Sequence, residues 1–156
     1  MTNFERKISA AQGYTELGML EDAIAELDSI EPALQRGSAV IEMRLLILMR
    51  AKRWREALPL SYELCRLHPE ATAGFVHSAF CLHELGRTQE AKEMLLSGPP
   101  AMQREPTYFY NLACYDVALG NIDQALRNAE RSFQMDKRYR EFAKADPDLA
   151  AIRHLL

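Results

Sequence analysis

Apolar side chains recur along this chain at the three- and four-residue intervals of a helix. Ile41, Leu45 and Leu48 mark one such face, and Leu58, Leu64 and Leu67 mark another. No segment shows the strict apolar and polar alternation of a half-buried strand. The pattern predicts four helix pairs, at 4–17 with 20–34, 38–51 with 54–68, 72–85 with 88–97, and 106–119 with 122–136.

The four pairs repeat every 34 residues, and several positions keep that period without an insertion. A small or apolar residue in the first helix, a turn residue and an alanine in the second helix recur in phase. Glycine just past a helix end supplies the left-handed backbone that closes the helix, and small side chains let two helices approach closely. The aligned sets are Ala11, Leu45, Ala79 and Ala113; Gly18, Lys52, Gly86 and Gly120; and Ala23, Ala57, Ala91 and Ala125.

With this period, the stretches FYNLACY…LGNIDQAL, ELGRTQEA and AKRWREAL…LHP resemble tetratricopeptide repeats. The resemblance implies an all-α fold, a right-handed superhelical α-solenoid of antiparallel helix pairs. It also implies a single domain over 1–156, with repeats at 4–37, 38–71, 72–105 and 106–139 and a C-terminal cap at 140–156.

Two features depart from the regular repeat. Only the second copy keeps the closing proline, Pro69, and the third copy contains the sequence SGPP at 97–100. Since a helix does not easily continue through Gly-Pro-Pro, we expect the second helix of that copy to lose about one turn. Residues 101–105 are then expected to form an irregular connector.

The last twenty residues, KRYREFAKADPDLAAIRHLL, predict a closing helix. Asp146 suits the N-cap position and Pro147 the first helical position. Leu149, Ile152 and Leu155 are expected to cover the open core of the last repeat, as terminal elements of solenoids must.

Composition narrows the classes of partner. Nineteen Lys and Arg residues against 22 Asp and Glu residues leave a formal charge of −3 and a pI near 5.8, which argues against nucleic acid as a partner. The start lacks the apolar core of a signal peptide, and no apolar run is long enough to span a bilayer. A cytoplasmic location without membrane binding is therefore predicted, and Cys65, Cys81 and Cys114 do not suggest a disulfide framework.

Candidate chemistry is sparse. No phosphate loop, dinucleotide fingerprint, zinc-protease motif or nucleophile elbow is present, so neither an enzyme nor a cofactor is predicted. His77 and Cys81 lie four residues apart on one helix, with His83 and Cys114 as the nearest candidates to join them. Structural zinc sites bring paired ligands at short spacings, so no metal site is predicted here.

Asp116 is unusual because its aligned positions hold Tyr14, Leu48 and Leu82, which should pack inward. A buried carboxylate needs a partner. The sequence-based hypothesis pairs Asp116 with Arg153 or Tyr139 of the C-terminal cap, so that it would fix the orientation of the cap.

The family resemblance implies that first helices form a concave wall that binds peptides. Asn111 matches the family's asparagine that hydrogen-bonds a peptide backbone, whereas the family's clamp for a C-terminal carboxylate is not reproduced. The predicted function is a non-enzymatic module that binds a protein or peptide segment, either an amphipathic helix or an extended apolar stretch. A dedicated chaperone for one exported or assembly-prone client is the alternative, and a homodimer through the groove or an exposed end stays open. The predicted wall residues are Ile8, Gln12, Glu42, Leu46, Met49, Val76, His77, Phe80, His83, Tyr110, Asn111 and Cys114.

Overall fold

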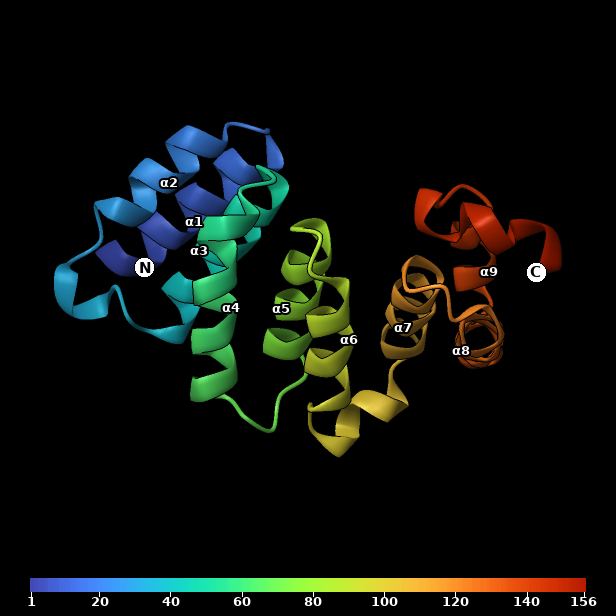
Figure 1. Ribbon diagram of the computed structural model, residues 1–156. Helices are drawn as coiled ribbons and strands as arrows, with labels where there is room; N and C mark the ends of the chain where they lie inside the picture. Colours follow the sequence, from blue (N-terminus) through green and yellow to red (C-terminus); the bar gives the residue numbers. More distant parts are fainter. The chain divides into compact units, whose positions relative to one another are not determined.

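A computed structural model describes all 156 residues, Met1–Leu156, and contains helices without a strand (Figure 1). The prediction of an all-α fold is therefore confirmed. Nine α-helices are joined by turns and by three 3₁₀ segments, labelled η. In chain order the elements are α1 (Asn3–Glu16), α2 (Leu20–Asp28), η1 (Pro32–Leu34), α3 (Ser38–Arg50), α4 (Trp54–Leu67), α5 (Ala73–Glu84), α6 (Thr88–Leu96), η2 (Pro100–Arg104), α7 (Pro106–Ala118), α8 (Ile122–Met135), α9 (Arg138–Ala143) and η3 (Pro147–Leu155).

The turn inside each helix pair has the predicted left-handed residue. Gly18, Gly86 and Gly120 have φ angles of 75°, 78° and 81°, and Lys52 adopts the same conformation with a φ of 57°. In all four turns the next amide donates to a carbonyl five residues back, which is the closing hydrogen bond of a Schellman motif. These bonds run from Met19 to Tyr14, from Arg53 to Leu48, from Arg87 to Leu82 and from Asn121 to Asp116.

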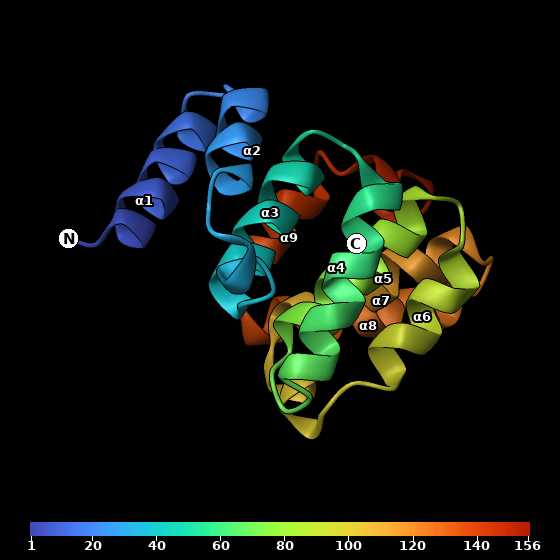
Figure 2. The same ribbon diagram turned by 90° about the vertical axis from the view of Figure 1, so that its left-hand side faces the viewer.

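Each turn lays its two helices against each other, so that α1 packs on α2, α3 on α4, α5 on α6 and α7 on α8. Figures 1 and 2 both show α1 and α2 side by side. The aligned alanines of the second helices, Ala23, Ala57, Ala91 and Ala125, are completely buried. Their lack of a larger side chain permits the close approach of the paired helices.

The contacts divide the chain into two compact units, Met1–His68 and Pro69–Leu156. The first unit holds α1 to α4, and its core includes Leu27, Val40 and Ile47 with Ile8 and Tyr14 packed against it. The second unit holds α5 to η3. The assignment of residues 1–156 to a single domain stays a prediction.

Helix α2 ends six residues before the predicted boundary at 34. The reason is Pro32: the residue before it, Glu31, has an extended backbone with φ −52° and ψ 137°, which a proline imposes on its predecessor. The side chain of Gln35 then donates to the carbonyls of Leu27 and Ile30, at 2.7 and 2.9 Å. A side chain thus replaces the missing helical turn as the partner of these carbonyl groups.

Helix α6 ends at Leu96, close to the predicted shortened end, but the connector after it is ordered as η2 rather than irregular. Met102 of η2 is buried and explains this order. A Cβ atom on Gly98 would lie 2.0 Å from the Met102 Sδ, so the glycine leaves the space that the methionine fills. Burial of that side chain holds the segment in place.

The C-terminal cap consists of α9 and the nine-residue η3. As predicted, Asp146 precedes the first turn, and its side chain accepts a hydrogen bond from the Asp148 amide at 2.9 Å. Leu149 and Ile152 are completely buried, whereas Leu155 is 53% exposed. The prediction that Leu155 also covers the core is wrong, because the segment ends beside the surface of α8, where Leu155 lines a shallow open pocket.

Candidate functional site

In the first unit, the predicted wall residues belong to α1 and α3, which contact each other. Ile8 is partly buried and packs against the core, so it contributes to stability as well as to the predicted wall. Gln12 and Glu42 are exposed, and Met49 is half-buried. Leu46 is 45% exposed, which leaves a large apolar side chain on α3 in contact with water.

In the second unit, the predicted wall residues belong to α5 and α7, and the C-terminal segment covers part of this face. Tyr110 and Cys114 of α7 are buried, although both were predicted to line an open groove. The α7 helix packs against η3, which is why these two side chains are not accessible. The remaining predicted residues of this face are half-buried, namely Val76, His77, Phe80, His83 and Asn111.

Two carboxylates of the C-terminal segment meet polar side chains of the wall. The Tyr110 hydroxyl donates to Asp146 Oδ2 at 2.6 Å, and the His83 Nε2 lies 3.3 Å from Asp148 Oδ2. The other ring nitrogen of His83, Nδ1, lies 3.0 Å from the Thr88 hydroxyl. These contacts tie residues 146–148 to both α5 and α7.

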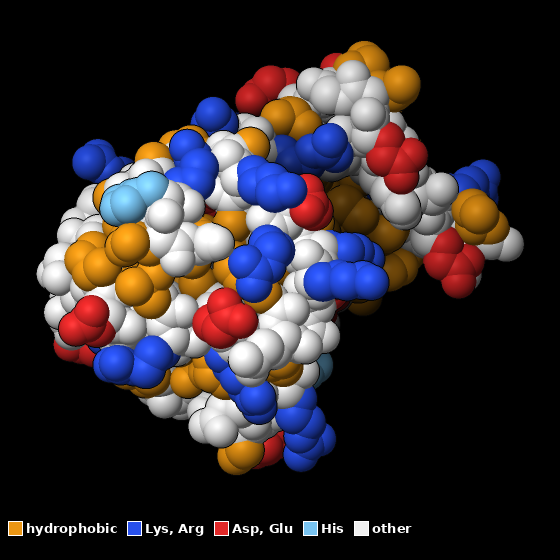
Figure 3. All heavy atoms as spheres, turned by 90° about the vertical axis from the view of Figure 1, so that its right-hand side faces the viewer, with side chains coloured by type: hydrophobic (Ala, Val, Ile, Leu, Met, Phe, Trp, Pro, Cys, Tyr) orange, Lys and Arg blue, Asp and Glu red, His pale blue; other side chains and the backbone are white.

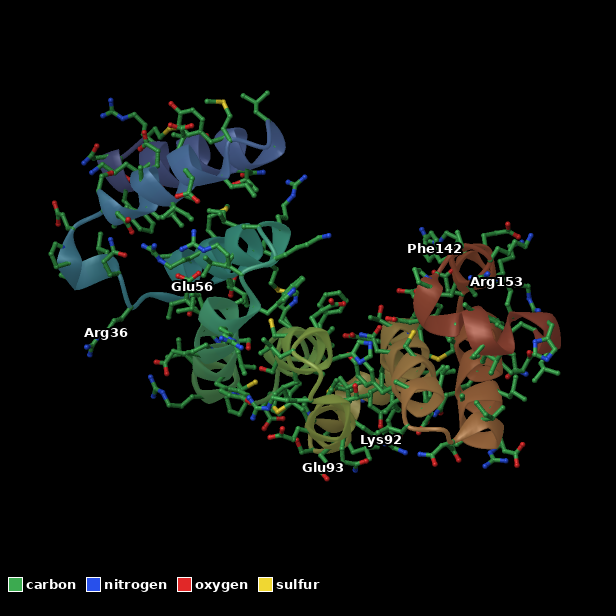
Figure 4. The ribbon with its side chains drawn as sticks, turned by 45° about the horizontal axis from the view of Figure 1, so that its top comes forward. Arg36, Glu56, Lys92, Glu93, Phe142 and Arg153 are labelled. Carbon is green, nitrogen blue, oxygen red and sulfur yellow. The ribbon has the colours of Figure 1, made fainter.

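The rest of the segment is held by burial and by one arginine. Leu149 and Ile152 enter the core of the second unit. Arg153 donates from its guanidinium to the Asp146 carbonyl at 2.9 Å, which closes the segment on itself. Figure 4 shows Arg153 and Phe142 on this C-terminal part of the chain.

The electrostatics of this face follow from its burial. Burial raises the pKa of the Tyr110 hydroxyl far above its ordinary value, and the hydrogen bond to Asp146 raises it further. Burial likewise raises the pKa of the Cys114 thiol, with Asp146 and Asp148 adding to the effect. Both groups therefore stay protonated at neutral pH, so Tyr110 remains a hydrogen-bond donor and Cys114 is a poor nucleophile.

One polar group of the face has no partner. Tyr115 is only 2% exposed, and its buried hydroxyl makes no hydrogen bond. Its ring lies 4.9 Å from that of His83. A buried hydroxyl without a partner is costly, so this group is notable beside the covered wall.

Asp116 is completely buried, as its position in the repeat suggested, but its predicted partners are wrong. The carboxylate accepts from Lys92 Nζ at 2.6 Å, from Asn128 at 2.9 Å and from Asn121 at 3.3 Å. Figure 4 shows Lys92 on α6, which packs against α7. Asp116 therefore joins the third and fourth helix pairs.

The two cap residues that were predicted to pair with Asp116 have other partners. The Tyr139 hydroxyl lies 2.5 Å from that of Thr107, and Arg153 bonds to backbone carbonyls of Ala143 and Asp146. The cap is thus fixed by Tyr110, Thr107 and His83 of α7 and α5 and by its own arginine. Asp116 does not orient it.

The chain brings no three His, Cys, Asp or Glu side chains together in an arrangement that could hold a metal ion. Burial raises the pKa of the Cys81 thiol to about 11, with a smaller effect from Glu84. None of the three cysteines forms a disulfide.

None of the helices has both the length and the apolar character needed to cross a bilayer.

The comparisons with known proteins bear on the fold. No protein-family model matches the sequence, and no curated protein matches it. Solved structures do match. One titled MamA MSR-1 C2 is 17% identical, covers 85% of this chain and 76% of its own, and has a TM-score of 0.73. A MamA RS-1 ArsTM double mutant is 13% identical, covers 86% and 75%, and has a TM-score of 0.76.

The chain has a tetratricopeptide-like helical repeat fold. A further MamA structure, titled with AMB-1, covers 94% of this chain and 76% of its own at 17% identity, with a TM-score of 0.68. At these identities the likeness concerns the backbone. The likeness therefore assigns no function to individual residues of this chain.

Sequence reasoning missed the residues that contact the wall from within the chain. The sequence pattern predicts only an N-cap role for Asp146, and it predicts no contact for Asp148 and none between Lys92 and Asp116. The two acidic residues around Pro147 were a usable signal, because an N-cap needs only one of them. The second acidic residue, Asp148, contacts His83.

Proposed function

We propose that this chain is a protein-interaction module that holds a peptide or protein segment against the faces of its first helices. In the first unit these faces belong to α1 and α3, and in the second unit to α5 and α7. Within each unit the two first helices contact each other and present a shared face, and binding through such a face needs no catalytic group. The proposal thus concerns recognition of a protein segment and not a reaction.

The observation that carries the proposal is the segment already seated on the second unit. Residues 146–152 lie on α7 as a bound peptide would, with Asp146 meeting Tyr110, Asp148 meeting His83, and Leu149 and Ile152 buried. The face therefore has the mixture of apolar contact and hydrogen-bonding groups that recognition of a short segment requires.

The first unit supports the proposal with exposed apolar surface. Leu46 on α3 is 45% exposed, and Met49, three residues further along the helix, is half-buried. Adjacent apolar side chains on one helical face offer area that a partner can bury. In this unit no segment of the chain plays the part that η3 plays in the second.

The test is capture of partners by the full chain and by two matched variants. Leu46→Glu places a charge on the first-helix face, and Leu96→Glu makes the same change at a side chain of α6 that is 56% exposed. Both variants should keep the helical content of the wild type in circular dichroism, because both positions contact water. We expect Leu46→Glu to abolish capture of a partner that Leu96→Glu retains.

The opposite result would place recognition on the second helices and overturn the proposal. If neither variant loses capture, the face of α3 does not bind the partner, and that part of the proposal is overturned. Once a partner is captured, its own state distinguishes an interaction module from the chaperone alternative. A module should bind the folded protein or its linear segment reversibly, whereas a chaperone should bind only the unfolded client.

A further inference from the structure

We infer that the face of α5 and α7 beneath η3 recognises an acidic, proline-initiated turn of a partner protein, and that the chain's own residues 146–152 compete for it. The recognised chemistry is that of the segment itself: two acidic residues flanking a proline, then two branched apolar residues three positions apart. This inference rests on the proposed function and specifies its partner class and its regulation.

The contacts show what the face selects. Each flanking carboxylate meets a different wall side chain, since Tyr110 donates to Asp146 at 2.6 Å and His83 lies 3.3 Å from Asp148. Pro147 fixes the backbone at the first position of the turn. Leu149 and Ile152 supply the buried apolar area. A ligand without both acids would leave Tyr110 without an acceptor and His83 without its carboxylate contact.

The seated segment is built to exchange. Its nine residues form a 3₁₀ helix, whose hydrogen bonds have poorer geometry than those of an α-helix and which is uncommon beyond three or four residues. It follows α9 through a short exposed turn at Lys144 and Ala145. Leu149 and Ile152 are its only buried residues, so its release breaks few apolar contacts and leaves the helices of the second unit in place.

The unpartnered Tyr115 hydroxyl indicates that the chain's own segment is not the best occupant. It is buried beside His83, in the part of the wall that meets Asp148, and the segment offers it no acceptor. A partner with one more carboxylate or carbonyl at this place would satisfy the hydroxyl and gain a hydrogen bond that the cap lacks.

A different protein fits this role better than a second copy of the chain. A second copy would offer the same contacts as the tethered segment while losing the advantage of the tether, which sets a high effective concentration. A partner wins only by contacts that the chain's own segment does not make. Tyr115 provides one such contact.

The experiment uses the full chain and a fluorescent peptide with the sequence KADPDLAAIRHLL, residues 144–156. Fluorescence anisotropy measures its affinity for the wild type, for an Asp146→Asn, Asp148→Asn variant, and for an Asp22→Asn, Asp123→Asn control. The control removes two exposed aspartates from the first turns of α2 and α8. The variant weakens the tethered segment and leaves the wall intact.

We expect the peptide to bind the variant at least tenfold more tightly than it binds the wild type or the control, because a hydrogen bond to a charged group is worth about this factor or more. A peptide carrying both asparagines should lose this advantage. Alkylation of Cys114, which the segment covers, should accelerate in the variant, whereas that of Cys81 should not.

Equal affinity for all three chains would place the peptide elsewhere and overturn the inference. Faster alkylation of Cys114 without peptide binding would also overturn it, because the face would then be exposed without holding a ligand. Concentration-dependent dimers of the variant in light scattering would show that a second copy of the chain occupies the face, which also overturns the inference. Should the variant unfold, Arg153→Ala, which removes the guanidinium bond to the Asp146 carbonyl and leaves Tyr110 and His83 in place, serves in the same assay.

Failure of this inference and failure of the proposed function are separable. The peptide assay measures only the face of α5 and α7, whereas the capture assay changes Leu46 on α3. If capture depends on Leu46 and the peptide does not bind, only the inference is lost. If the peptide binds and capture ignores Leu46, the wall of the first unit is not a site.

Discussion

The buried ion pair between Lys92 and Asp116 offers a quantitative test of how the third and fourth helix pairs are joined. The two charged atoms lie 2.6 Å apart, Asp116 is completely buried, and the Lys92 side chain is 22% exposed. Lys92→Met keeps the aliphatic stem and removes the charge. The carboxylate then keeps only its hydrogen bonds from Asn128 and Asn121.

Breaking a buried pair from one side costs about 3–5 kcal/mol, because a buried charge is left uncompensated. Water can approach through the space that the partly exposed lysine leaves, so we expect the lower end, about 3 kcal/mol. For a chain of this size that loss lowers the melting temperature by roughly 6–12 °C. Asp116→Asn should also destabilise, since the amide must face donors from Lys92 and Asn128.

Urea denaturation followed by circular dichroism measures these free energies in a double-mutant cycle. Lys92→Met combined with Asp116→Asn removes the stranded charge, so the double variant should be more stable than the sum of the single losses by about 1–2 kcal/mol. Lys144→Met, which breaks an exposed pair with Glu141, serves as the control and should not change stability measurably. A stable Lys92→Met variant, or strictly additive losses, would refute the assigned role of the pair.

Three further predictions concern single positions. Lys52 holds a left-handed conformation that costs a residue with a Cβ atom about 1 kcal/mol. Lys52→Gly should therefore raise the free energy of unfolding, measured by urea titration, by roughly 0.5 kcal/mol. A lower free energy of unfolding would contradict this. Tyr115→Phe removes the unsatisfied hydroxyl and should stabilise the chain by about 1 kcal/mol in the same assay, whereas destabilisation would mean that the hydroxyl has a partner. Burial raises the pKa of Cys81 from 9.0 to about 11, so the protonated thiol favours the folded state. The free energy of unfolding should therefore stay constant below pH 9 and fall as the pH rises toward 11. Urea midpoints that stay level across this range would count against this prediction.

Local sequence determined the helices and the turns between them. Each turn depends on a left-handed residue and on hydrogen bonds within six residues, so a pattern of 34 residues locates Gly18, Gly86 and Gly120 and even the odd Lys52. The buried alanines follow from the same period, because each lies on a second helix that packs against the first helix of its own pair. The early end of α2, where the predicted boundary is wrong, is also local, because Pro32 imposes an extended backbone on Glu31.

Partners that come from distant parts of the chain could be decided only by the tertiary structure. The repeat indicated that Asp116 is buried, but Lys92, Arg153 and Tyr139 were all available to meet it, and only the packing of α6 on α7 selects Lys92. Tyr110 and Cys114 have the sequence pattern of an open groove. They are buried because the backbone after α9 turns back, which no periodicity encodes. Helical periodicity is a property of neighbouring residues, whereas the covering of a wall depends on how a segment distant in the sequence packs in space.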